Sequence, residues 1–378
     1  MSARTSKAVG FVIQIFRIRW LVSLLAVVIA FAIGAVFIVL ADASVVDAYY
    51  AMFRGSIVDL NAPNAVRMFK PLTDSLFYSI PLIISGLGLA LGFRAGLFNI
   101  GGKGQIIVGA LAAVWVGFSL NLPPVVHTLV ALLVAIVAGG LYGGIAGVLK
   151  AKTGANEVIV TIMLNSIATL GLGYILTQKA WQVPGTNQPV TPKVAETAAL
   201  ARLLPAPFKL HVGFLVALVA LVAFWWLIER STLGFQIRAV GANAAAARTA
   251  GISVERITAI TMVLSGAFLG LAGANEALGT IGYVSRDVAG SIGFDAITVA
   301  LLGRNKTWGT FGAGLLFGAF KAGGSAMQAK GVPIDMILIL QSVIVLLIAV
   351  PDALAVAVPA VRRRRVEQAR KEKSDEHK

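Results

Sequence analysis

The polar residues best placed to do chemistry in this chain lie inside or beside long apolar segments. Most are amides and carboxylates, which can hydrogen-bond a polar solute or join two helices. An unpaired polar group in hydrocarbon is costly, so each should face a bundle interior or a water-filled path. The candidates for lining such a path are Asn99, Gln105, Asn156, Glu157, Asn165, Glu276 and Asp295, and Asn275 and Lys321 share this setting. For any single one, a structural role in capping or joining helices is the favoured alternative.

Catalytic and metal chemistry find no support in the sequence. The chain has no cysteine, and its three histidines, His127, His211 and His377, stand singly. They form no metal-ligand spacing, and no nucleophile or metal set converges within the apolar segments. We therefore expect no metal, no cofactor bound by this chain, and no enzymatic activity.

The glycine-rich stretch FNIGGKGQ (98–105) resembles a phosphate-binding loop at first sight. The Walker A spacing requires a glycine five residues before Gly102, and Leu97 stands there. Any nucleotide hydrolysis must therefore come from another chain. The glycines break the helical pattern instead, and such a break is tolerated only where protein or a water-filled cavity satisfies the backbone.

These residues are carried by recurring apolar runs. The chain is 58% hydrophobic with a mean hydropathy of +0.86 and only 13% charged residues. Runs of about 20 residues span a hydrocarbon core. We predict an all-α, polytopic membrane helix bundle of about ten transmembrane helices. The expected spans are 20–40, 72–93, 104–120, 126–149, 157–177, 211–228, 257–279, 292–303, 308–328 and 335–358.

The distribution of basic residues sets the expected orientation. With both termini cytoplasmic, the inner segments hold 22 Lys and Arg against 9 outside. This accounts for the net charge of +15 and argues against a nucleic-acid partner. We expect a cytoplasmic N-terminus (1–19), a transmembrane domain (20–358) and a basic cytoplasmic tail (359–378) near anionic membrane lipid.

Glycines and loops add detail to this bundle. Glycines spaced by four, as at Gly139 and Gly143 or Gly266 and Gly270, form grooves for close helix packing. The loop 178–210 is rich in proline and suits an ordered, irregular cap, although a plain connector is an equal alternative. A faint echo of 98–110 in 294–313, with opposite expected direction, suggests an inverted repeat.

The most specific loop connects two spans at 229–256. Asn243 can cap a helix, Ala244 to Ala247 favour one, and Gly251 can end it. The result is about two turns of exposed helix, suited to a groove on a partner. An ordinary interfacial helix is the alternative.

At this point the residues resemble a known family. The segment LGFQIRAVGANAAAARTAGISVERITAITMVLSGAFLGLAG (233–273) is similar to the cytoplasmic loop and following helix of permeases from ATP-binding-cassette (ABC) importers for simple sugars, nucleosides and branched-chain amino acids. The segments 293–320, 96–114 and EVIVTIMLNSIA (157–168) resemble that family's other signatures. FNIGGKGQ and EVIVTIMLN look most like the nucleoside branch, which works with a lipoprotein of the basic-membrane-protein class.

The resemblance implies a type II importer fold in a bacterial plasma (inner) membrane. It implies a second permease chain, forming a heterodimer, a cytoplasmic ABC ATPase that binds ATP, and an external substrate-binding lipoprotein. The expected ATPase-coupling residues are Gly241, Asn243, Ala247, Arg248 and Gly251. The expected cargo is a nucleoside or simple sugar. A secondary active transporter of a small polar solute is the alternative, and a channel or a membrane enzyme is less favoured.

Overall fold

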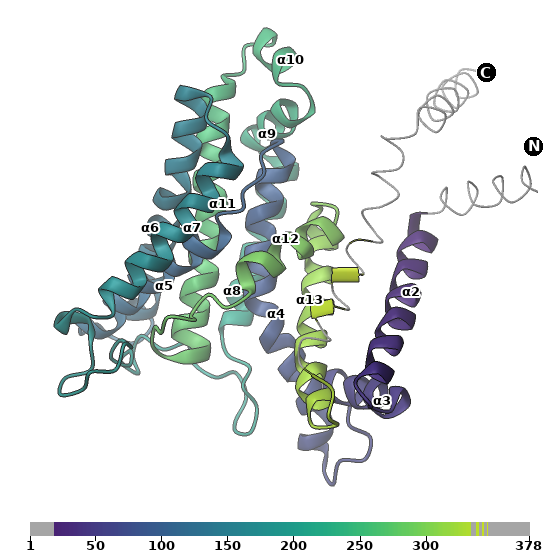
Figure 1. Cartoon of the computed structure of the whole chain (residues 1–378). Helices are drawn as coiled ribbons and strands as arrows, with labels where there is room; N and C mark the ends of the chain where they lie inside the picture. The colour runs from purple at the N-terminus through teal and green to yellow at the C-terminus, as the bar shows by residue number, and fades with distance from the viewer. Residues whose placement is uncertain (1–18, 334–337, 340–341, 344–345, 347–378) are drawn as a thin grey trace, which may run out of the picture. The chain divides into compact units, whose positions relative to one another are not determined.

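The computed structural model describes residues 19–333, 338–339, 342–343 and 346. Every regular element in this part of the chain is helical (Figure 1). The elements are α2 (Arg19–Leu40), α3 (Val45–Ser56), α4 (Ala65–Arg94), α5 (Gly102–Ser119), α6 (Val126–Thr153), α7 (Glu157–Ile175), η1 (Lys179–Trp181), α8 (Gly213–Trp225), η2 (Trp226–Arg230), α9 (Thr232–Ala242), α10 (Ala244–Thr249), α11 (Val254–Asn275), η3 (Glu276–Ile281), α12 (Ile292–Leu302) and α13 (Thr307–Gln328). The predicted helical class is confirmed.

The chain divides into a smaller unit, Met1–Tyr50 with Met327–Lys378, and a larger unit, Ala51–Ala326. Within the smaller unit, the Tyr49 hydroxyl donates to the Phe31 carbonyl, and their rings meet edge to face at 5.1 Å between centroids. The larger unit holds α4 to α12 and nearly all of α13, and it contains every predicted site residue.

The number of membrane crossings differs from the expected ten. By length and composition, six described helices can cross a membrane: Ala65–Arg94, Gly102–Ser119, Val126–Thr153, Glu157–Ile175, Gly213–Arg230 and Val254–Ile281. A seventh is counted if the bent pair Val28–Leu40 and Val45–Ser56 forms one span. The expected count of ten is therefore not confirmed.

Two expected spans do not cross on these criteria, and a third cannot be placed. The span expected at 292–303 is the 11-residue α12, whose length of about 16 Å is half of a hydrocarbon core. The span expected at 308–328 is the helix α13, which is not among the six. The span expected at 335–358 lies mostly outside the described residues, as do the terminal segments 1–19, apart from Arg19, and 359–378.

Helix α11 lies at the centre of the larger unit and packs against α4, α5 and α6. The predicted glycine grooves face each other across α6 and α11. A Cβ on Gly139 would lie 2.5 Å from the Gly266 carbonyl oxygen, and one on Gly270 would lie 2.3 Å from the Ala135 carbonyl oxygen. The two backbones therefore touch, and no larger residue fits at either position.

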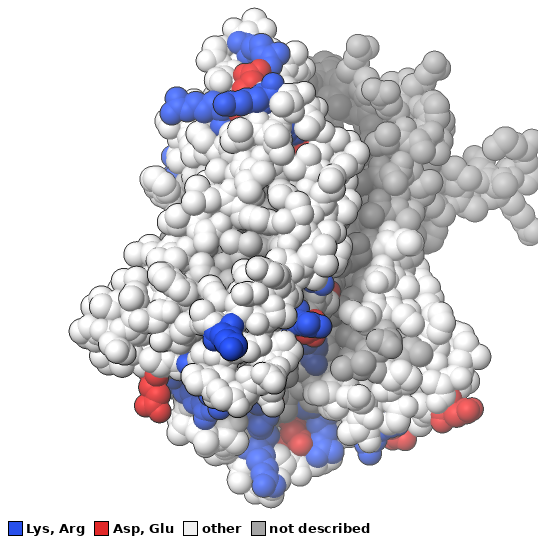
Figure 2. Space-filling view, turned by 60° about the vertical axis from the view of Figure 1, so that its left-hand side comes forward, with Lys and Arg blue, Asp and Glu red and all other residues white. Residues whose placement is uncertain are grey.

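On one face of the larger unit, most charged side chains gather at its two ends. Figure 2 shows Lys and Arg at both ends of this face, with a mostly uncharged flank between them. One end carries α9 and α10, and we call it the α10 end (Figure 1). The opposite end carries the loop 178–210, and we call it the cap end. The uncharged flank matches the band that a bilayer would cover.

Candidate functional site

The predicted break at FNIGG lies halfway along the bundle. Helix α4 ends at Arg94 at the α10 end, and residues 95–101 lead back into the bundle before α5 begins at Gly102. A Cβ on Gly102 would lie 3.5 Å from Cδ2 of Leu269, which is fifteen residues into the 28-residue span Val254–Ile281. Helix α5 therefore starts at mid-depth, where its first backbone N–H groups need partners.

A buried amide pair satisfies much of this break. Asn99 donates from Nδ2 to Gln105 Oε1 at 3.0 Å and to Ser265 Oγ at 2.9 Å. Its Oδ1 accepts the Gly101 N–H at 2.9 Å and the Gln105 amide at 3.3 Å. Asn99 and Gln105 are each only 1% exposed. In this conformation the two side chains bond to each other, and Asn99 also bonds the Gly101 backbone and the Ser265 hydroxyl.

Helix α7 supplies three further hydrogen bonds. Asn165 Oδ1 accepts the Gly104 N–H at 2.7 Å, and its Nδ2 donates to the Ile100 carbonyl at 2.8 Å. Thr161 Oγ1 accepts the Ile100 N–H at 3.2 Å. The structure thus brings three predicted residues, Asn99, Gln105 and Asn165, into one network. Their role in lining a path stays a prediction.

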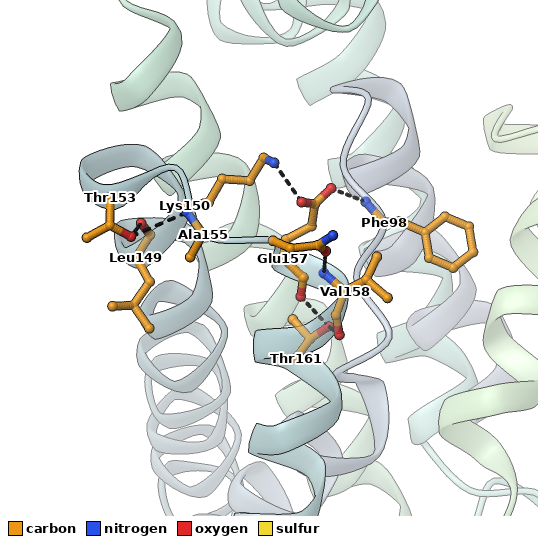
Figure 3. A network of polar contacts seen from close by, with 9 residues as sticks. Phe98, Leu149, Lys150, Thr153, Ala155, Glu157, Val158 and Thr161 are labelled. Atoms are coloured by element: carbon orange, nitrogen blue, oxygen red, sulfur yellow. Dashed lines mark hydrogen bonds and ion pairs between the residues drawn. The ribbon is translucent and has the colours of Figure 1, made fainter.

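Glu157 connects the start of the break to the turn between α6 and α7 (Figure 3). Its carboxylate pairs with Lys150 Nζ at 2.6 Å and accepts the Phe98 N–H at 3.4 Å. Asn156 caps α7, because its Oδ1 accepts the Val158 N–H at 2.9 Å. Both predicted residues therefore lie at the α10 end, beside the start of the broken segment 95–101.

A second break precedes α12 and comes in from the cap end. Residues 282–291 follow η3 without regular helix, and α12 starts at Ile292. A Cβ on Gly293 would lie 2.5 Å from the backbone nitrogen of Lys103, so the first turns of α5 and α12 touch. Arg94 Nε donates to the Asn305 carbonyl at 2.8 Å, which places the far end of α12 near the α10 end. The two broken segments therefore enter from opposite ends and meet.

Charged residues gather beside this second break. Lys321 Nζ of α13 lies 3.0 Å from Asp295 Oδ2, and Ser291 Oγ donates to the same oxygen at 2.7 Å. Glu276, in η3, lies within range of the Lys321 charge. Asp295 is thus the carboxylate that pairs directly with Lys321. The sequence identifies Lys321 as a polar residue within a span, but the predicted path-lining set does not include it.

Several participants were missed altogether. Ser265 and Thr161 complete the network around the first break, but isolated hydroxyls are common in membrane helices and give no distinguishing signal. Among the described residues, no group of His, Asp and Glu has the arrangement of a metal site.

The loop between η2 and α11 has the predicted form. Asn243 Oδ1 accepts the Ala246 N–H at 3.1 Å and caps α10, which covers Ala244–Thr249. Gly251 has a φ of 82° and donates its N–H to the Arg248 carbonyl at 3.0 Å, ending the helix. Arg248 pairs with Glu255 at the start of α11.

Two of the predicted coupling residues pack against this chain itself, and their role in coupling stays a prediction. Ala247 is 4% exposed, so its methyl group lies inside the chain. The exposed alanines of α10 are Ala244, Ala245 and Ala246. Gly241 packs directly on the end of α4, since a Cβ there would lie 2.0 Å from the Arg94 carbonyl oxygen.

The loop 178–210 is an ordered cap, as one of the two alternatives expected. Its backbone donates from Ala195 to Gly117 at 2.8 Å and from Leu200 to Leu278 at 3.1 Å. His127 holds it from α6: Nε2 lies 3.0 Å from the Val116 carbonyl, so it donates there, and Nδ1 accepts from the Thr197 hydroxyl at 2.8 Å.

His211 closes this cap beside α8. Its ring packs edge to face on Phe77 at 5.5 Å, and its Nδ1 accepts the Gly213 N–H at 3.1 Å. Burial lowers the pKa of the His211 imidazole to about 4, because the charged form is poorly solvated there. The ring is therefore neutral at physiological pH.

The architecture is that of a polytopic helical membrane protein with two broken helices that meet inside the bundle. The family described as "Branched-chain amino acid transport system / permease component" matches residues 72–349. The chain belongs to this family, and it is an ABC transporter permease, a transport subunit and not an enzyme.

The chain is similar to permeases of known cargo. It is 40% identical to the guanosine ABC transporter permease NupP of Bacillus subtilis, over 87% of this chain and 92% of that protein. It is 36% identical to the glucose permease TsgB13 of Haloferax volcanii, over 85% of each. It is 31% identical to the nucleoside permease NupB of Lactococcus lactis, over 94% and 97%.

A second, less similar permease from two of these organisms also matches. These are the guanosine permease NupQ of Bacillus subtilis, at 29% identity, and the nucleoside permease NupC of Lactococcus lactis, at 26%. They cover 65% and 72% of this chain. No solved structure matches the chain.

Proposed function

We propose that this chain is a permease subunit of an ATP-driven importer that carries a nucleoside into the cell. The observation that supports this best is the 40% identity to a guanosine permease over nearly the whole length of both chains. The glucose permease, at 36%, keeps a monosaccharide as the second candidate substrate.

The proposed assembly has four kinds of component. Two organisms each hold a pair of matching permeases, which supports a heterodimer of this chain with a second permease. A cytoplasmic ABC ATPase would bind and hydrolyse ATP, and an external lipoprotein would deliver the cargo. The complex would lie in the bacterial plasma (inner) membrane, with the α10 end and both termini of this chain in the cytoplasm.

The loop geometry gives a route for coupling ATP hydrolysis to the path. The exposed face of α10 would seat in a groove of the ATPase. Movement of α10 would pass through α9 to Gly241, which packs on Arg94, and Arg94 immediately precedes the broken segment 95–101. A shift at α10 would thus move the start of the first break, and through Gly102 and Gly293 the second.

The cargo path would run beside these two breaks. Non-helical backbone inside a membrane protein is tolerated where protein or a water-filled cavity satisfies it. In the present conformation Asn99 accepts the Gly101 N–H and Asn165 accepts the Gly104 N–H, while Gln105 bonds to Asn99. Alternating access would exchange some of these bonds for bonds to the hydroxyl and amide groups of a nucleoside.

Uptake by a strain lacking the genomic copy tests the substrate. We expect the wild-type gene to restore accumulation of labelled guanosine or uridine, and unlabelled glucose or ribose in excess should not compete. Competition by the monosaccharides alone would move the substrate to the second class. A variant lacking α10 provides the control for expression without coupling.

The partly buried Lys321–Asp295 pair favours one alternative, a secondary transporter that couples to an ion gradient. Purified permeases in vesicles distinguish the two. The proposed importer should accumulate cargo only when its ATPase, ATP and lipoprotein are present. Accumulation driven by a proton or sodium gradient alone would overturn the proposal.

A further inference from the structure

A cleft of about 730 Å³ lies at the α10 end of the larger unit, and Arg94 is the one lining residue that the coupling route above also uses. We call it the basic cleft. Its walls come from the end of α4, from the junction of α8 with η2, and from the first turn of α13. The side chains that define it are Arg94, Trp225, Glu229, Arg230, Lys306 and Trp308.

The cleft carries excess positive charge. Arg94 is committed to its neighbours, since its Nε donates to Asn305 and its Nη2 lies 3.7 Å from the Glu229 carboxylate. Within the described residues, no carboxylate pairs with Arg230 or Lys306. The Arg230 guanidinium lies 5.4 Å from the centroid of the Trp225 ring. Two basic side chains are thus available to an anion.

Exposed tryptophans place the cleft at the level of lipid headgroups. The side chains of Trp225, Trp226 and Trp308 are 36%, 59% and 69% exposed. Tryptophan concentrates at membrane–water interfaces, where its ring is half apolar and its N–H is polar. Arg230 is two residues before α9, so this interface belongs to the α10 end.

The walls suit a phosphate with apolar chains attached. The first turn of α13 lines the cleft with Thr307, Trp308 and Gly309, and the N–H groups of a first helical turn lack partners within the helix. The side of α8 next to the cleft's tryptophans is apolar and open, with Val219 and Val222 at 69% and 59% exposed. A free phosphate makes no favourable contact with that apolar flank, whereas the acyl chains of a phospholipid do.

We propose that the basic cleft binds the phosphate headgroup of an anionic phospholipid from the leaflet at the α10 end. Arg230 and Lys306 supply the charge, the start of α13 supplies backbone donors, and the exposed tryptophans pack against the glycerol and upper acyl chains. The site needs only that the chain spans a membrane. It is independent of which solute is transported.

Native mass spectrometry of the purified permease complex tests this. We expect phosphatidylglycerol to stay bound where phosphatidylcholine does not. The double variant Arg230→Gln with Lys306→Gln should weaken phosphatidylglycerol binding by about 25-fold, since each basic side chain near an anionic surface contributes about fivefold. The matched control is Lys152→Gln, an exposed lysine at the same end outside the cleft, which should retain wild-type binding.

If the double variant folds poorly, two single variants replace it. They are the charge-preserving Arg230→Lys and the change Lys306→Gln at an exposed side chain. The first should bind within about twofold of wild type, and the second should lose about fivefold. Equal loss in the Lys152→Gln control would overturn the proposal, because the attraction would then be general. Complete displacement by millimolar inorganic phosphate, or unchanged lipid binding with lost ATPase association, would overturn it too.

Discussion

Gly102 and Gly293 bring the first turns of two broken helices into backbone contact inside the bundle. A Cβ on Gly102 would lie 3.1 Å from the Gly293 carbonyl oxygen, and one on Gly293 would lie 2.5 Å from the Lys103 nitrogen. The segments before them enter from opposite ends of the larger unit. The predicted inverted repeat of 98–110 and 294–313 requires two segments that run in opposite directions, and that repeat stays a prediction.

Replacing Gly293 with alanine should separate these helix starts. The new methyl group would meet backbone, which cannot move aside as a side chain can, so we expect a loss of about 1 to 3 kcal/mol in stability. Transport should fall with it. Thermal unfolding of the purified protein and uptake rates measure both effects.

Gly312→Ala is the matched control in α13, because nothing lies within 4 Å of its added Cβ. It should leave the melting temperature within a degree or two. Equal effects from the two substitutions would contradict the close contact between α5 and α12.

Alanine at Asn165 should leave the Gly104 N–H and the Ile100 carbonyl without their partners. Each unsatisfied buried group costs about 1 to 3 kcal/mol, so Tm should fall clearly. If Asn165 also lines the path, the concentration of cargo at half-maximal uptake will rise. A fall in Tm with unchanged apparent affinity would make its role structural, and the same comparison applies to Asn99 and Glu157.

Glutamate at Ala245 should uncouple the ATPase. Ala245 is on the exposed part of α10, and a carboxylate desolvated in a docking groove costs about 2 kcal/mol or more. We expect ATP-dependent uptake to drop by about tenfold or more, with Tm unchanged. The control Lys152→Glu places the same group at the same end outside α10.

Glutamate at Ala247 should behave differently, because that position is buried. It should lower Tm before it affects coupling. Normal ATP-dependent uptake by Ala245→Glu would count against α10 as the ATPase contact.

The sequence predicted helix caps better than the depth at which each helix begins in the membrane. Asn243 and Gly251 define α10 as expected, because capping depends on residues within one turn. The segment 292–303 was predicted to cross because its apolar character is that of a span. The contact of Gly293 with Lys103 shows instead that this segment begins at mid-depth in the bundle, beside the start of α5.

The polar candidates illustrate the same division. The sequence identifies Asn99, Gln105 and Asn165 because a polar group within an apolar run is costly unless it has a hydrogen-bond partner. Which groups they bond could not be read from the sequence, because Ser265 lies 166 residues from Asn99. The burial of Ala247 also depends on how the whole loop folds back on the bundle.

The neutral His211 should make the cap end sensitive to acid. Its pKa is about 4 in the folded chain and about 6.5 when unfolded, so the unfolded state binds the proton more readily. Stability is therefore full above pH 6.5 and falls as the pH drops towards 4, by about 2 kcal/mol between pH 7 and pH 5. Melting curves of wild type and His211→Gln at the two pH values measure this. A variant with the same loss on acidification would assign it to other groups.

Variants of the Lys321–Asp295 pair can show whether these two charges stabilise the fold or take part in the transport cycle. Asp295→Asn should leave Lys321 without its nearest counter-charge beside the second break, and we expect a loss of about 2 kcal/mol or more. The effect should be smaller than for a fully buried charge, because the Lys321 side chain is 28% exposed. Lys321→Met combined with Asp295→Asn removes both charges, and it should recover most of the stability and of the ATP-driven uptake. Recovery of stability without recovery of transport would mean that the charges act in the transport cycle itself, because the fold would then be intact and only the charges missing.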